Sequence, residues 1–192
     1  GPNIPVISVA IRDKSGSPSV AIDDELAAYD ATRHLLRIGH RSIGLLAGDP
    51  ASVFVAEPRK RGYLRAMREA NCTPVTATGN FFYESGATGL DGLLAQDPGL
   101  TAIFAVSDEM GAAVVNELQK RGRRVPDDVS VLGFDNTSTS LHVHPPLSTM
   151  GQPLEEMGRT AVSKLLRARD LGPKVMPHRL IHRGSTAPPP AA

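Results

Sequence analysis

Three pairs of short polar residues each follow an apolar run that is typical of a buried strand. They are Gly48–Asp49, Ser107–Asp108 and Asp135–Asn136. A carboxylate such as that of Asp135 accepts hydrogen bonds through two neighbouring oxygens, which suits a pair of adjacent hydroxyl groups. Polar residues at several strand ends therefore indicate a binding site for a small polar molecule.

Two further kinds of side chain could complete such a site. Arg59 follows Gly48 near the start of a helical stretch and carries a planar fork of hydrogen-bond donors. Phe81 or Phe82 could cover the apolar face of a sugar or purine ring. Each residue also has an ordinary structural explanation: Asp108 as a helix cap, Arg59 as a solvated helix arginine, and both phenylalanines as core residues.

The sequence shows no apparatus for catalysis or metal binding. His142 and His144 lie beside two prolines with no third ligand nearby, which argues against a metal site. The chain has neither a glycine-rich phosphate loop nor a G-x-S-x-G nucleophile turn. Cys72 has no obvious paired base, and a single cysteine excludes disulfides within the chain. We therefore expect no cofactor, no metal and no enzymatic activity.

The balance of charge argues against a large nucleic-acid-binding surface. The 192 residues include 21 basic and 20 acidic side chains, which gives a formal net charge of +1. Domains that bind DNA usually carry a clear excess of basic residues. The basic run 120–124 falls at the end of a predicted helix, where cations are favoured, so we interpret it as a solvated helix end. With no signal-peptide pattern, no apolar run of membrane-spanning length and one cysteine, we expect a cytoplasmic location.

Short apolar runs alternate with stretches of helical spacing. Strands are predicted at 6–10, 20–22, 43–47, 75–78, 102–106, 129–134 and 179–182. Helices are predicted to begin near Asp23 or Asp24, Pro58, Glu84, Ser107 and Pro153, with a long loop before the last of them. The alternation indicates βαβ units, so the fold class is α/β, a doubly wound parallel sheet with helices on both faces. Ligands of such sheets bind beyond the carboxyl ends of the strands.

An ordered set of motifs resembles the LacI/GalR (lactose-repressor) family of transcriptional regulators, from about Pro5 to Thr186. The segment from Arg124 to Asn136, RVPDDVSVLGFDN, is almost the consensus of that family. The other matching segments, in chain order, are residues 31–36, 39–41, 59–63, 84–86, 101–110, 145–149, 152–158 and 183–186. One such motif is weak, but the ordered set with compatible spacings is specific.

The resemblance implies a periplasmic-binding-protein-like domain with a complete C-terminal lobe and a partial N-terminal lobe. It divides the chain into a remnant of the N-terminal lobe at 1–22, the C-terminal lobe at 23–149, a return helix at 150–170 and a final C-lobe segment at 171–186. Residues 187–192 have little to bury, and their composition predicts a disordered tail. The helix-turn-helix domain with which members of that family begin is not within these 192 residues.

The resemblance also implies roles for individual residues. Arg59 and Asp135 would be polar contacts to a small-molecule effector, Phe81 would stack on its ring, and Leu154 would form an apolar wall. Ser107 stands where the family often has asparagine, and this departure puts the usual amide contact in doubt.

The function implied is that of an effector-sensing and dimerisation domain in a DNA-binding transcriptional regulator. The effector would be a sugar or nucleoside-like molecule, and operator DNA would be bound only through the helix-turn-helix domain. Homodimer contacts are expected at residues 82–87, 112, 116 and 139–143. Two alternatives stay open: a periplasmic sugar-binding protein of a transport system, which shares the fold, and an enzyme of the doubly wound class.

Overall fold

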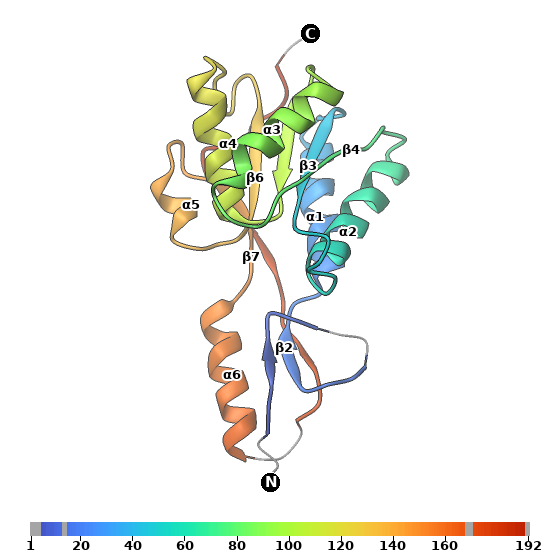
Figure 1. Cartoon of the computed structure of the whole chain (residues 1–192), viewed down its shortest axis with the longest axis vertical. Helices are drawn as coiled ribbons and strands as arrows, with labels where there is room; N and C mark the ends of the chain where they lie inside the picture. The colour runs from blue at the N-terminus through green and yellow to red at the C-terminus, as the bar shows by residue number, and fades with distance from the viewer. Residues whose placement is uncertain (1–4, 13–14, 168–170, 191–192) are drawn as a thin grey trace.

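The computed structural model describes residues 5–12, 15–167 and 171–190, which form a larger and a smaller unit stacked end to end (Figure 1). The larger unit contains a six-stranded sheet of order β4-β3-β5-β6-β7-β9, parallel except for the last strand. Its strands are β3 (Ile43–Ala47), β4 (Val75–Thr78), β5 (Ala102–Ala105), β6 (Ser130–Asp135), β7 (Ser148–Gly151) and β9 (Arg179–Ile181).

Helices cover both faces of the larger sheet. They are α1 (Asp24–Arg37), α2 (Ala56–Glu69), α3 (Ser85–Gln96), α4 (Asp108–Lys120) and the short α5 (Thr139–His142). Helices α1 and α2 pack against each other, and α3 packs against α4 on the opposite side of the sheet (Figure 1). The predicted α/β class, with a parallel sheet between helices, is confirmed.

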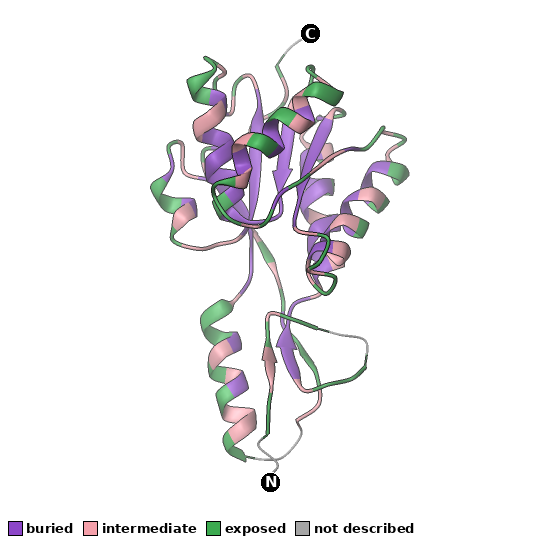
Figure 2. Cartoon of the chain, in the orientation of Figure 1, coloured by how far each residue is buried: buried purple, intermediate pink, exposed green. Residues whose placement is uncertain are grey.

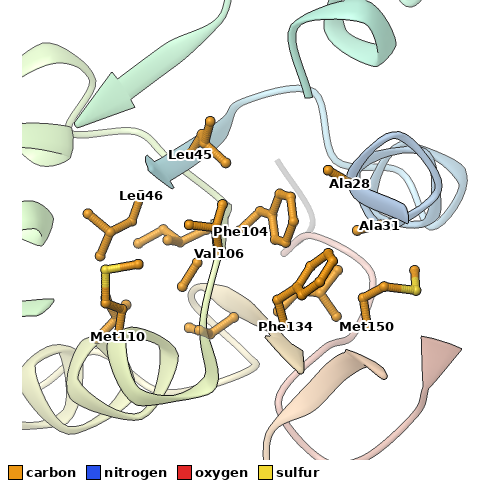
Figure 3. Close-up of a cluster of buried hydrophobic side chains, with 14 of the residues drawn as sticks. Ala28, Ala31, Leu45, Leu46, Phe104, Val106, Met110, Phe134 and Met150 are labelled. Carbon is orange, nitrogen blue, oxygen red and sulfur yellow. The ribbon is translucent and has the colours of Figure 1, made fainter. Parts of the chain in front are cut away.

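The core lies between the sheet and these helices, and strands β3, β5 and β7 are buried along their whole length (Figure 2). Strands β3 and β5 consist of apolar residues and glycine, as expected where both faces of a parallel sheet are covered. Phe104 of β5 and Phe134 of β6 pack with their ring centroids 6.3 Å apart. Figure 3 shows Phe134 with Ala31 of α1 and Met150 of β7 close by.

The smaller unit is a three-stranded parallel sheet with one helix. Its strands are β1 (Ser8–Val9), β2 (Ser19–Ala21) and β8 (Lys174–Val175), and the helix is α6 (Leu154–Arg167). Met157 and Ala161 form the buried stripe of α6, which packs against β1 and β2. The arrows of β1 and β2 point toward the larger unit and that of β5 points toward the smaller one (Figure 1). The carboxyl ends of the two sheets therefore face each other.

Three elements were not predicted from the sequence. Strand β7, strand β8 and helix α5 are each four residues or shorter, so their apolar spacing is too brief to show a period. Strand β7 owes its burial to pairing with β6 on one side and β9 on the other. Among the described residues, no helix has both the length and the apolar character needed to cross a membrane.

The prediction of a disordered tail is wrong at Ala187, its first residue. The N–H of Ala187 donates to Ser130 Oγ at 3.0 Å, and its carbonyl oxygen lies 2.9 Å from His40 Nε2. Residues 191–192 lie outside the described part of the chain, as do 1–4 of the expected N-lobe remnant and 168–170 of the expected return helix. The lobe boundaries implied by the resemblance stay a prediction.

Helices α1 and α2 approach closely at Gly62. A Cβ atom added at this glycine would lie 2.7 Å from the backbone nitrogen of Tyr29 and closer still to the carbonyl oxygen of Glu25. Because both neighbours are backbone atoms of α1, neither can move aside by changing rotamer. The absence of a side chain at Gly62 therefore sets the distance between the two helices.

We predict that Gly62→Ala destabilises the fold by about 2 kcal/mol, because overpacking of a tight helix contact usually costs about that much. Gly158→Ala in α6 is the matched control, since a Cβ at Gly158 meets no atom within 4 Å and alanine is the better helix former by roughly 1 kcal/mol. Urea denaturation followed by circular dichroism measures both changes. Equal stability of the two variants would contradict the close helix contact.

Candidate functional site

A row of four polar side chains lies where the two units meet. Asp24 begins α1, Arg59 lies in the first turns of α2, Asp135 ends β6 and Gln152 follows β7. Arg59 Nε donates to Asp24 Oδ1 at 2.8 Å, and Arg59 Nη2 lies 3.4 Å from Asp135 Oδ1. Gln152 Nε2 donates to the same Asp135 oxygen at 2.6 Å. One guanidinium thus holds two carboxylates that come from different elements.

Arg59 is a buried residue and not a solvated helix arginine. Its side chain is 3% exposed, its Nη1 donates to the carbonyl oxygen of Val106 at 2.6 Å, and its guanidinium carbon lies 3.8 Å from the centre of the Phe134 ring. Each of its three nitrogens therefore faces a protein oxygen. In this arrangement Arg59 positions Asp24 and Asp135.

Asp135 is the part of the row that reaches solvent. Its side chain is 23% exposed, and its Oδ2 accepts no hydrogen bond from the described residues. The backbone of both Asp135 and Asn136 has positive φ, +107° and +62°, so the chain turns sharply at the strand end. Burial raises the pKa of Asp135 and the nearby Arg59 guanidinium opposes that rise; the same two causes act on the pKa of Asp24.

Phe81 and Ser107 are brought together at the neighbouring strand ends. Ser107 Oγ donates to the carbonyl oxygen of Phe81 at 2.8 Å and accepts from the N–H of Met110 at 3.2 Å, which makes Ser107 the N-cap of α4. The Phe81 ring lies against Gly48, where a side chain would clash with it. Phe81 also has positive φ, +73°. The hydroxyl of Ser107 is thus engaged within the protein.

Leu154 stands apart from the row, as the exposed first residue of α6. It lines a hollow of about 450 Å³ between the two units, together with Asn136, Gln152, Pro153, Glu155, Glu156, Arg159 and Arg179. A second hollow, of about 300 Å³, borders Asp24 at the other end of the row and is lined by Arg12, Ile22, Asp23, Glu25, Leu26, Phe54, Pro58, Arg61 and Arg65. Each hollow thus adjoins one end of the row, and of the five predicted residues Leu154 alone lines either of these two hollows.

Asp24 and Gln152 belong to the row but are not predicted from the sequence as site residues. Asp24 closely follows the short apolar run 20–22, so the same strand-end rule that selected Asp135 could have found it. Gln152 follows β7, which was not predicted, so no comparable signal existed. Its Oε1 is buried and accepts no hydrogen bond from the described residues.

The interpretation of Asp108 as a helix cap is wrong, since the N-cap of α4 is Ser107. The two carboxylate oxygens of Asp108 accept from Thr149 Oγ1 at 2.6 Å, from the N–H of Thr137 at 2.6 Å and from Thr137 Oγ1 at 3.1 Å. Asp108 is 1% exposed, and burial raises its pKa to about 6 against these hydrogen bonds. The side chain therefore ties α4 to β7 and to the loop that follows Asp135.

Comparison with known proteins decides the family. A model of the periplasmic binding protein-like domain matches residues 32–186. The chain belongs to this family. Within it, the chain is 34% identical over 190 residues to catabolite control protein A of Priestia megaterium, a match that covers 94% of this chain and 57% of that protein. The chain thus spans about half the length of the curated relatives it matches.

Solved structures of this periplasmic-binding-protein-like family agree. The dimeric Lac repressor superposes with a TM-score of 0.90 at 28% identity, covering 97% of this chain and 70% of that one. A complex of the transcriptional regulator CelR with cellobiose superposes with a TM-score of 0.83 at 30% identity, covering 93% and 58%. The resemblance to LacI/GalR regulators is confirmed, and these relatives are regulators and not enzymes.

We predict that stability falls as the pH rises through the titration of Asp108. A buried acid with a folded pKa of about 6 binds its proton more tightly than in the unfolded chain, so its ionisation costs stability. The unfolding free energy of the wild type, relative to Asp108→Asn, should therefore fall by roughly 2–3 kcal/mol between about pH 4 and pH 6.

Asp128 supplies a control of opposite sign. Hydrogen bonds from Arg124 lower its pKa to about 2, so the stability that it contributes is lost as the pH falls from about 4 toward 2. Chemical denaturation of the wild type, Asp108→Asn and Asp128→Asn between about pH 2 and pH 6 measures both effects. A wild-type stability that does not change relative to Asp108→Asn between pH 4 and 6 would refute the prediction.

Proposed function

We propose that this chain is the effector-binding part of a LacI/GalR-type transcriptional regulator and that a sugar or nucleoside-like molecule binds at the row Asp24–Arg59–Asp135–Gln152. The observation that carries the proposal is the position of the row. It lies at the carboxyl ends of the parallel strands, where the two units meet, in a chain whose relatives are regulators. Ligands of open α/β sheets bind at this edge.

Binding at this place supplies a mechanism for sensing. The chain passes between the units after β2, after β7 and before β9. An effector that contacts both Asp135 in one unit and α6 in the other binds more tightly to one orientation of the units. Only such a difference in affinity can shift the equilibrium between orientations.

The chemistry of the row fits binding and not turnover. The carboxylates of Asp24 and Asp135 both face the fixed charge of Arg59, and the hydroxyl of Ser107 is engaged as a helix cap. The Oδ2 of Asp135, which accepts no hydrogen bond from the described residues, would be an acceptor for the hydroxyl groups of a sugar. Phe81 and Leu154 would supply apolar contacts on either side. The proposed role is therefore non-enzymatic.

The partners in the whole protein follow from the same proposal. Operator DNA would bind outside these 192 residues, since a formal net charge of +1 gives little attraction for phosphates, and the regulator would act in the cytoplasm. We also propose a homodimer through the faces of α3, α4 and α5. Phe82 and Leu141 are 61% and 57% exposed there, and Asn116 of α4 donates to the Tyr83 hydroxyl at 2.7 Å.

A transport protein of the same fold is the alternative function. The relatives that match most of this chain are transcriptional regulators, including catabolite control protein A, and CelR binds cellobiose in its complex. These names favour the regulator and make sugars the first compounds to test.

We predict that Asp135→Ala weakens effector binding at least tenfold, because a hydrogen bond to a charged group contributes roughly 1.5–3 kcal/mol. Isothermal titration calorimetry with cellobiose, ribose, adenosine and cytidine, first on the wild type, identifies the compound for the comparison. Asp49→Ala is the control, since Asp49 also follows a strand but its Oδ1 caps the N–H of Ala51. Equal affinity of the wild type and Asp135→Ala would rule out the assigned site.

We predict that Leu141→Glu shifts the protein from dimer to monomer at micromolar concentration, because a buried unpaired charge at the interface costs several kcal/mol. Leu166→Glu is the control, since Leu166 is exposed on α6 in the smaller unit. Sedimentation velocity measures both variants. A dimer that survives Leu141→Glu, or a wild type that sediments as a monomer, would remove the proposed interface.

A further inference from the structure

The side chain of Arg183 is hydrogen-bonded to the turn that carries Asp135. Arg183 follows β9, and its Nη2 donates to Asn136 Oδ1 at 2.5 Å. Its Nη1 donates to the carbonyl oxygen of Leu147 at 2.6 Å and lies 3.1 Å from Ser140 Oγ. One guanidinium thus joins the residue next to Asp135, the short helix α5 and the start of β7.

The backbone around Arg183 is itself anchored to the sheet. The N–H of Arg183 donates to Ser148 Oγ at 2.9 Å, and the N–H of Ser148 donates to Ser185 Oγ at 2.8 Å. Ser185 Oγ in turn donates to the carbonyl oxygen of Val131 at 2.6 Å. These bonds fix the base of the side chain to β6 and β7, so its guanidinium is a firm point of attachment for the turn.

The turn is held from a second side by Asp108. Asp108 accepts both the N–H and the hydroxyl of Thr137, and the carbonyl oxygen of Thr137 accepts from Ser140 Oγ at 2.6 Å. A hydrogen-bonded path therefore runs from the turn to Ser140, which is fully buried inside α5.

The turn needs this support because its backbone is strained. Asp135 and Asn136 both have positive φ, a conformation that costs free energy for residues other than glycine and persists only where the surroundings impose it. The direction of the Asp135 carboxylate therefore depends on contacts made by its neighbours. Two sets of these contacts reach α5: those of Arg183 with Asn136 and Ser140, and that of Thr137 with Ser140.

We propose that Arg183 is a positioning residue that sets the Asp135 carboxylate and couples its state to α5. A change at the carboxylate moves Asn136, and Arg183 passes that movement to Ser140 and to the exposed Leu141 beside it. The role as an effector relay rests on the proposed function, because it takes Asp135 as the effector contact. The mechanical coupling itself needs no ligand.

The experiment uses this chain without ligand. Asp135→Asn keeps the shape of the side chain and removes its charge, and amide chemical shifts and hydrogen exchange of residues 139–143 are followed by NMR. We expect a response at α5 in the wild-type background and a response reduced by at least half in the Arg183→Gln background, as for coupled residues in a double-mutant cycle. A purely structural role for Arg183 would lower stability but leave the response to Asp135→Asn intact.

A second variant keeps the test decisive if Arg183→Gln does not fold. Asn136→Gly removes the acceptor of the Arg183 bond, tolerates positive φ and leaves the bonds to Leu147 and Ser140 in place. Asp49→Asn is the control perturbation and should leave α5 unchanged in every background. An unchanged response in the Asn136→Gly background, or no response at α5 in the wild-type background, overturns the proposal.

The outcome is separable from that of the proposed function. If none of the four compounds binds but α5 responds through Arg183, the coupling stands and the effector site falls. If a compound binds through Asp135 while α5 responds equally with and without Arg183, the effector site stands and the coupling falls.

Discussion

The geometry of the site depends on one buried guanidinium, that of Arg59. Removing a charge from water is costly, and the cost is recovered only when the charge is paired and its hydrogen bonds are satisfied. Here Asp24, Asp135 and the carbonyl oxygen of Val106 face its three nitrogens. Because each partner belongs to a different element, α1, α2, β6 and the end of β5 must meet at one point for Arg59 to be buried at all. The row Asp24–Arg59–Asp135–Gln152 is therefore built by folding, which would lower the ordering cost of binding a ligand there.

Small residues make that meeting possible. Gly62 lets the backbone of α1 pass against α2, which brings Asp24 to within 2.8 Å of Arg59. Gly48 leaves room for the Phe81 ring. The backbone carbonyl oxygen of Phe81 then accepts a hydrogen bond from the Ser107 hydroxyl. The polar contacts at the strand ends thus depend on two positions that have no side chain. A change at either glycine alters the site from a distance.

The sequence was sufficient for the parts of the molecule that follow a local pattern. The apolar runs predicted β3, β5 and β6, and the strand-end rule selected Asp135 before any family was considered. It was insufficient where a contact joins residues that are distant in sequence. The helical pattern of α2 does not show that Arg59 lies against Asp24, because the two residues are 35 positions apart. Likewise Asp108 has the spacing of a cap, and only the fold brings Thr137 and Thr149 to its oxygens.

The remaining hydrogen-bonding capacity of the row determines what it can recognise. The nitrogens of Arg59 and Gln152 Nε2 already face protein oxygens, whereas Asp135 Oδ2 and Gln152 Oε1 accept nothing from the described residues. These two oxygens are therefore acceptors without a donor in the described part of the chain, beside the N–H groups of Arg59 and Gln152 that exceed the contacts above. Leaving a buried acceptor such as Gln152 Oε1 without a donor costs free energy, and Gln152 lies where the chain crosses from β7 to α6. A donor that reached this buried oxygen would thus lower the free energy of the segment that joins the two units.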